Sequence, residues 1–227
     1  MTDLITKDLT ASEEDMSLIN ALAQSELKAE DVYIFKLRLC DNEVDRDYEA
    51  FTAACLKSLA EKFKNRTVIN DHEPKSKNQV ARIFKTEVNE LEITASTGEP
   101  YTELIAYCYM PKAGNEKIIS DIESGIKSEC SVGCSVSKSI CSICGAELHS
   151  GGCEHIKGKS YNGSLCFCKL DEPTDAYEVS FVAIPAQKNA HVIKSYSSDG
   201  SHTPNHEPET KSLMQKLQKL FNILQED

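Results

Sequence analysis

The chain has 227 residues, with 36 Asp and Glu against 25 Lys and Arg, and a formal net charge of −11. This acidic balance argues against a dedicated nucleic-acid binder, because phosphate recognition depends on clustered basic side chains. No run approaches the roughly 18 apolar residues of a membrane span, and residues 1–7 lack the pattern of a signal peptide. We therefore expect a cytoplasmic protein with one compact domain that binds neither nucleic acid nor membrane.

The first 30 residues are polar and acidic, and residues 31–194 carry the pattern of a folded domain. Within the first segment, apolar residues recur at helical spacing behind Ser12, a capping candidate with Asp15 three residues on, so we expect a short helix there. Alternating, β-branched segments in the domain predict strands at 32–40, 67–70, 80–88, 103–110, 130–140 and 177–184. Helices are expected at 48–63 and at 115–124, the second ended by Gly125.

The composition changes after residue 194. Residues 195–208 are rich in Ser, Pro, His, Asp and Glu, a composition typical of a disordered linker. Residues 209–227 then predict a C-terminal amphipathic helix, because five apolar residues share one face: Leu213, Leu217, Leu220, Phe221 and Leu224.

Six of the ten cysteines lie between residues 134 and 168. Cytosolic thiols stay reduced, so clustered cysteines point to metal binding, although single ones are often small buried hydrophobes. The set Cys141, Cys144, Cys153 and His155 has the spacing C-x2-C-x8-C-x-H, with glycines for tight turns, and predicts a tetrahedral zinc site. Four protein ligands leave no open position, so this zinc would be structural. Two alternatives stay open: Cys166 and Cys168 as the second pair, and His149 as a ligand.

Three segments carry candidate catalytic side chains. His72 ends an expected strand in Asn-Asp-His-Glu-Pro, Ser131 lies in Cys-Ser-Val-Gly, and Glu178 begins the strand-like Glu-Val-Ser-Phe-Val-Ala-Ile-Pro-Ala. Serine hydrolysis needs a base beside the hydroxyl and a third group that orients the imidazole. Composition alone supports such a triad weakly, because the chain has many serines, and Ser128 and Ser135 compete as nucleophiles.

The order of these segments resembles the tailed-phage prohead proteases. An acidic turn at 45–47, a helix, the His motif, Ser-Val-Gly and the Glu-Val-Ser-Phe-Val-Ala-Ile-Pro-Ala segment follow one another between Val32 and Ala190. The family is similar in fold to the herpesvirus assemblins. The resemblance implies an α+β fold, a small, mainly antiparallel β-barrel surrounded by helices. The zinc-knuckle insert at 141–168 departs from the family pattern, because many relatives connect the two flanking strands more briefly.

The resemblance also implies roles and partners. Ser131 matches the nucleophile, His72 the general base, and Glu178 the place of an acidic third member, where the assemblins have a second histidine. Backbone amides near Gly133, or the region of Arg82, are candidate oxyanion donors. The implied substrates are the major capsid protein, the scaffold and the enzyme's own tail, cut inside the assembling prohead in the host cytoplasm, and self-association stays open. Two alternatives are an inactive assembly or scaffold factor of the same fold and a zinc-knuckle adaptor.

Overall fold

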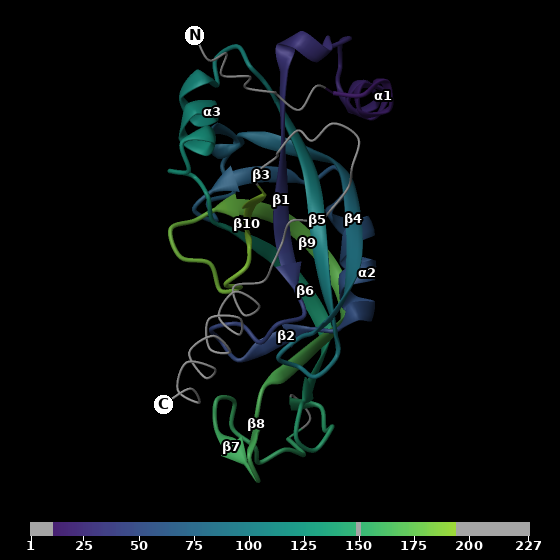
Figure 1. The fold of residues 1–227 in the computed structure, drawn as a ribbon, viewed down its shortest axis with the longest axis vertical. Coiled ribbons are helices and arrows are strands. Elements are labelled where there is room, and N and C mark those ends of the chain that lie inside the picture. The colour runs from purple at the N-terminus through teal and green to yellow at the C-terminus, as the bar shows by residue number, and fades with distance from the viewer. Residues whose placement is uncertain (1–10, 149–150, 194–227) are drawn as a thin grey trace, which may run out of the picture. The chain divides into compact units, whose positions relative to one another are not determined.

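The computed structural model describes residues 11–148 and 151–193, which form an α+β fold with a mixed eight-stranded sheet (Figure 1). Its helices are α1 (Glu13–Leu22), α2 (Ala53–Phe63) and α3 (Glu116–Glu123), with short 3-10 turns η1 (Ala29–Asp31) and η2 (Ser76–Asn78). The strands are β1 (Val32–Asp41), β2 (Glu49–Phe51), β3 (Thr67–Asn70), β4 (Ala81–Thr94), β5 (Pro100–Pro111), β6 (Cys130–Cys141), β7 (Ser160–Tyr161), β8 (Ser164–Leu165), β9 (Cys168–Phe181) and β10 (His191–Ile193). The linker expected at 195–208, the helix expected at 209–227, and His149 lie outside the described residues.

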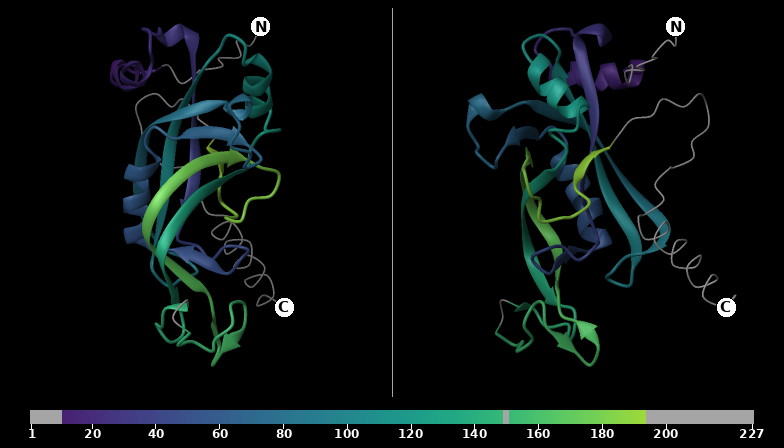
Figure 2. Two further views of the ribbon diagram at one scale, coloured as in Figure 1. Left: turned by 180° about the vertical axis from the view of Figure 1, so that it is seen from behind. Right: turned by 60° about the vertical axis from the view of Figure 1, so that its left-hand side comes forward.

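The sheet has the strand order β10-β1-β5-β4-β3-β9-β2, and β6 pairs with β9. Most neighbours are antiparallel, but β2 and β3 both run parallel to β9. Strands β7 and β8 form a separate small hairpin between β6 and β9, within the cysteine-rich segment (Figure 2). Strand β9 is therefore the centre of the fold, because it joins the segments that carry all three candidate catalytic residues.

The closed barrel implied by the resemblance is wrong for the described residues. Strand β10 approaches the start of β6 only through an isolated bridge between Glu129 and His191, with hydrogen bonds from Val192 N to the Ser128 carbonyl (2.7 Å) and from Cys130 N to the Ala190 carbonyl (3.1 Å). Closure of a barrel needs a continuous ladder. With only three residues, β10 is too short to supply one.

Local signals explain where the first two helices begin. Ser12 Oγ accepts a hydrogen bond from Asp15 N at 3.0 Å, and Asp15 Oδ2 accepts one from Ser12 N at 3.3 Å, so the expected capping box is confirmed. Helix α2 begins only after Thr52, whose hydroxyl accepts from Cys55 N at 3.0 Å. The helix expected from residue 48 is wrong at its start, because residues 49–51 pair with 168–170 of β9 instead.

Strand β9 begins nine residues ahead of the expected start at residue 177. Its first half contains Asp171, Glu172 and Pro173, which are poor strand formers. The ladder with β6 tolerates them through two bulges, one of which places Pro173 opposite Val136. Long-range pairing has therefore overridden local preference.

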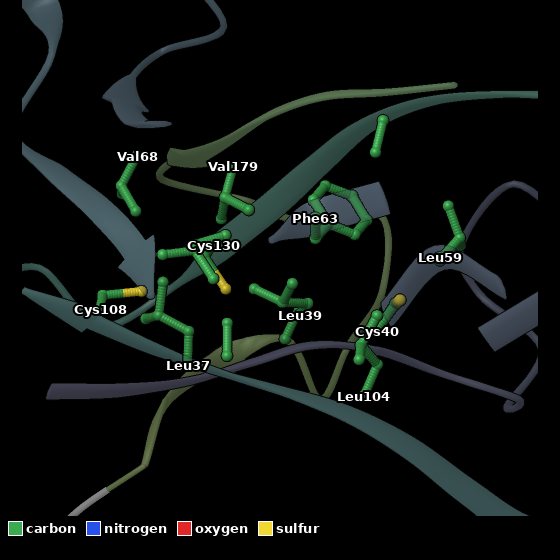
Figure 3. Packing of buried hydrophobic residues seen from close by; sticks show 14 of the residues in the cluster. Leu37, Leu39, Cys40, Leu59, Phe63, Val68, Leu104, Cys108, Cys130 and Val179 are labelled. Carbon is green, nitrogen blue, oxygen red and sulfur yellow. The ribbon is translucent and has the colours of Figure 1, made fainter. Parts of the chain in front are cut away.

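The core lies between α2 and the inner faces of the strands (Figure 3). Leu37, Phe63, Val68 and Val179 are fully buried there, and each such side chain contributes about 1.5–3 kcal/mol relative to an exposed position. Side chains alternate along a strand, so Val179 pointing into the core sends its neighbours Glu178 and Ser180 to the opposite face. The candidate catalytic residues are built on that outer face.

Candidate active site and metal centre

His72 lies in a tight turn directly after β3. Asp71 and His72 have φ angles of +56° and +52°, which non-glycine residues seldom adopt. Two hydrogen bonds to β9 hold them, from Asp71 N to the Phe181 carbonyl (3.0 Å) and from His72 N to Ser180 Oγ (3.0 Å). The parallel pairing of Ile69 with Ser180 sets this position, because it brings the end of β3 beside the end of β9.

The structure brings His72 and Glu178 into direct contact. His72 Nδ1 lies 2.8 Å from Glu178 Oε1, while the other oxygen, Oε2, accepts a hydrogen bond from Ser180 Oγ at 2.6 Å. The Glu178 side chain is 12% exposed and that of His72 is 45% exposed. The carboxylate of Glu178, held by Ser180 and largely buried, therefore contacts the half-exposed imidazole of His72. In serine hydrolases a carboxylate orients the general base in this way.

Gly133 makes room for this carboxylate. It pairs with Glu178 across the β6–β9 ladder, and a Cβ at Gly133 would lie 2.5 Å from Glu178 Oε1. The sequence had suggested this glycine as a source of oxyanion donors. The structure gives it a steric role that neither its motif nor its position had indicated.

Ser131 lies on the neighbouring strand, opposite Ser180. Paired residues of adjacent strands share a face and have Cβ atoms about 4.5–5.5 Å apart, so the half-buried Ser131 is adjacent to the side chain that contacts both His72 and Glu178. Within the described residues, however, Ser131 and His72 share no hydrogen bond. Catalytic hydrogen bonds often tighten only when substrate is bound.

The competing nucleophile Ser135 and the candidate oxyanion donor Arg82 lie farther from the His72–Glu178 pair. Ser135 Oγ is engaged with Thr174 Oγ1 at 2.6 Å, and Ser135 opposes Asp175, beyond a bulge from the Glu178 pair. Arg82 pairs with Thr67 at the start of β3, whereas His72 follows its end. Arg82 also donates to the Asn65 carbonyl at 2.8 Å, so its placement does not favour an oxyanion role.

A second cluster lies at the far end of the β6–β9 ladder. One ligand atom from each of Cys141, Cys144, Cys153 and His155 lies within 4.8 Å of the other three, so this Cys3His group could hold a metal such as zinc. These are the four residues preferred from spacing. The alternative pair fits less well: Cys166 Sγ is 3.9 Å from Cys141 Sγ but lies outside the four-atom group, and Cys168 is at the head of β9.

The turn after Cys141 is suited to a thiolate. Burial opposes ionisation, but backbone N–H groups of Cys144 and Ile143 and the neighbouring thiols lower the pKa of Cys141 to about 6. Ile143 N donates to Cys141 Sγ at 3.4 Å, and Gly145, with φ +73°, closes the turn. Zinc binds cysteine as the thiolate, so this turn favours the protonation state that a metal requires.

The two clusters are well separated. Cys141 pairs with Cys168 at one end of the ladder and Ser131 pairs with Ser180 near the other, ten residues along β6, or roughly 30 Å at about 3.3 Å per residue. A metal held by Cys141 therefore contacts neither His72 nor Glu178. The insert instead lies against the start of β2, where Lys157 Nζ is 2.6 Å from Glu49 Oε1.

No family model, curated protein or solved structure matches this chain. Among residues 11–148 and 151–193, no helix is long and apolar enough to cross a membrane. What the chain does must therefore be inferred from the geometry of its own residues.

Proposed function

We propose that the protein is a serine endopeptidase in which Ser131 is the nucleophile, His72 the general base and Glu178 the residue that orients it. The observation that carries the proposal is the 2.8 Å contact between His72 Nδ1 and Glu178 Oε1. The two residues are 106 positions apart in the sequence, His72 in the turn after β3 and Glu178 in β9. Ser131 supports the proposal by its place on the third strand of the same outer face.

The proposed chemistry starts from the His72 tautomer that carries its proton on Nδ1. Glu178 accepts a hydrogen bond from Nδ1–H of His72, which leaves the Nε2 lone pair free. As Ser131 Oγ attacks the peptide carbonyl, His72 Nε2 takes the hydroxyl proton, and it then gives this proton to the leaving amine. Water hydrolyses the resulting acyl-enzyme in the same way, with His72 again accepting and returning a proton. The cycle ends with Ser131 and His72 in their starting states.

The substrates we propose are the capsid and scaffold proteins of a tailed phage, cut inside an assembling prohead in the host cytoplasm. The resemblance around His72, Ser131 and the segment 178–186 supports this part, and it also suggests cleavage of the enzyme's own tail. Zinc would have a structural role, because the four residues that could hold it fill a tetrahedral shell. No step of the reaction involves it.

Two other functions each have one observation in their favour. The absence of a Ser131–His72 hydrogen bond among the described residues suits an inactive assembly factor of the same fold. The Cys3His cluster, with Ile156 exposed beside it, suits a zinc-knuckle adaptor. Neither explains why the largely buried carboxylate of Glu178 contacts the half-exposed imidazole of His72.

Co-expression with the matching capsid protein tests the enzyme. We expect the wild type to shorten the capsid protein or its scaffold segment and Ser131→Ala to leave it intact, as seen by intact-protein mass spectrometry. Ser135→Ala is the matched control, because it removes a hydroxyl from the same strand that bonds Thr174, and it should cleave like the wild type. Identical unprocessed products from the wild type and Ser131→Ala would contradict the proposal.

A further inference from the structure

Ser180 is a buried residue that touches two of the candidate catalytic residues at once. It is 0% exposed, its hydroxyl oxygen lies 3.0 Å from His72 N, and the same oxygen lies 2.6 Å from Glu178 Oε2. With the 2.8 Å contact between His72 Nδ1 and Glu178 Oε1, these bonds close a ring that begins and ends at His72.

Two groups that each have a single role, the backbone N–H of His72 and the carboxylate of Glu178, fix the direction of each hydrogen bond in this ring. The backbone N–H of His72 can only donate, so Ser180 Oγ must accept from it. The only hydrogen of the Ser180 hydroxyl is then directed to Glu178 Oε2, because leaving a buried donor unpaired is costly. An ionised carboxylate can only accept, so with Oε2 occupied by the Ser180 hydroxyl, Glu178 Oε1 accepts from His72 Nδ1. The imidazole must therefore carry its proton on Nδ1.

We propose that Ser180 is a positioning residue that holds the Glu178 side chain in the orientation from which Oε1 accepts the Nδ1 proton of His72. The inference rests on the proposed function, since the lone pair that this tautomer leaves on Nε2 is the one that would accept the Ser131 proton. Ser180 does not touch substrate in this scheme. It acts through the other two residues, on a strand position two residues from Glu178 and directly opposite Ser131.

Backbone conformation gives Ser180 a second task. Asp71 and His72 both have left-handed φ angles, and the bond from His72 N to Ser180 Oγ is one of the two that tie this turn to β9. Alanine at position 180 would leave the His72 N–H without its partner and would free one oxygen of Glu178. The carboxylate could then turn about its last bond, and the imidazole would lose its fixed partner.

Glu178→Gln provides a sharp test, because an amide has one acceptor and one donor end. With Ser180 present, its hydroxyl keeps the amide oxygen, so the amide NH2 faces His72 Nδ1. His72 must then accept at Nδ1 and carry its proton on Nε2. In the double variant Glu178→Gln/Ser180→Ala nothing holds the amide oxygen, so the amide can turn and offer that oxygen to Nδ1–H.

The measurement is the ¹⁵N spectrum of the His72 imidazole at a pH where the ring is neutral. We expect Nδ1–H in the wild type, Nε2–H in Glu178→Gln, and a substantial return of Nδ1–H in the double variant. Ser139→Ala, which removes another buried serine from the same ladder, should keep the wild-type signal. The inference is overturned if Glu178→Gln and the double variant have the same tautomer. Ser180→Ala alone should keep Nδ1–H, because either oxygen of an ionised carboxylate can accept that proton.

Reaction of Ser131 with a fluorophosphonate probe adds a functional measurement that needs no known substrate. We expect Ser180→Ala to slow labelling by up to about 100-fold, and Glu178→Gln by up to about 10⁴-fold, because its imidazole has the wrong tautomer. Ser180→Thr, which keeps the hydroxyl, should recover part of the rate. Failure of the wild type to label would contradict the enzyme proposal alone, since the tautomers would still decide the role of Ser180.

Discussion

Gly133 shows how one missing side chain shapes the candidate site. Any Cβ there would lie 2.5 Å from Glu178 Oε1, closer than a non-bonded contact permits. The obstacle is the end of a flexible side chain, so the carboxylate can move aside without disturbing the ladder. Its movement would break the contact with His72.

We therefore expect Gly133→Ala to fold with a loss of stability of about 1 kcal/mol or less, as for most substitutions that avoid the core. Labelling of Ser131 by a fluorophosphonate should nevertheless slow by about tenfold or more, as misplaced catalytic groups lose rate steeply. Gly98→Ala is the control, because its φ of +85° makes it strained but it has open space around it. It should cost stability and leave the labelling rate unchanged. Unaltered labelling in Gly133→Ala would show that Glu178 does not orient His72.

At the same scale, the sequence carried a signal for Ser180 that motif analysis did not use. Glu178 and Ser180 are two residues apart in a strand-like run, so they must share a face, and period-2 alternation alone could have paired them. The partner of that face, the turn at residues 71–72, depends on the parallel pairing of β3 with β9, which no local pattern reveals. His72, Ser131 and Glu178 were accessible through resemblance, and the four ligand candidates through their spacing.

At the scale of elements, local patterns predicted most helices and strands but not the connections made by β9. The short β2 forms because it pairs with the head of β9, and the polar first half of β9 forms because it pairs with β6, although β2 and this half of β9 are weak strands by themselves. Long-range pairing also explains why the sequence did not reveal that the sheet is open and not a closed barrel. Whether an edge closes depends on the length of the edge strand β10, whose three described residues follow a loop with a path that the sequence does not specify.

The cysteine-rich insert is attached to the sheet through the turn before β2. Cys168 N donates to the Tyr48 carbonyl at 2.8 Å, and the Tyr48 ring lies so close to Gly158 that a Cβ there would be 2.7 Å from Cε2 of the ring. On its other side the turn holds the loop after β9, since Arg46 Nη1 donates to the Pro185 carbonyl at 2.5 Å. A methyl group at position 158 would therefore collide with the Tyr48 ring and push the insert away from this turn.

We expect Gly158→Ala to loosen the insert without unfolding the sheet. Hydrogen exchange should accelerate at the amides of Cys166 and Cys168, which donate to the Lys159 and Tyr48 carbonyls. Gly163→Ala is a close control, since Gly163 has the same φ of +83° but no atom within 4 Å of the position that an alanine methyl group would take. Equal acceleration in both variants would mean that backbone strain, and not the Tyr48 contact, determines how the insert is held.

At the scale of the whole described domain, the β6–β9 ladder separates the candidate catalytic residues at one end from the Cys3His cluster at the other. The bulges between Gly133 and Cys134 and between Ser135 and Val136 lie between them. Bulges interrupt regular pairing, so a disturbance at Cys141 has little means of reaching Ser131 through the ladder. This arrangement favours a metal that folds the insert over one that tunes the active site.

Metal removal tests this separation. We expect purified protein to contain close to one zinc per chain by elemental analysis, and Cys141→Ser with Cys144→Ser to lose it. A chelator should accelerate hydrogen exchange in residues 151–168, because the four ligands would no longer be tied together. The rate of Ser131 labelling and the Nδ1–H signal of His72 should stay within about twofold of the untreated protein, since roughly 30 Å of strand lies between the two sites. Loss of labelling on chelation, with recovery on adding zinc, would instead show that the metal supports the active site from a distance.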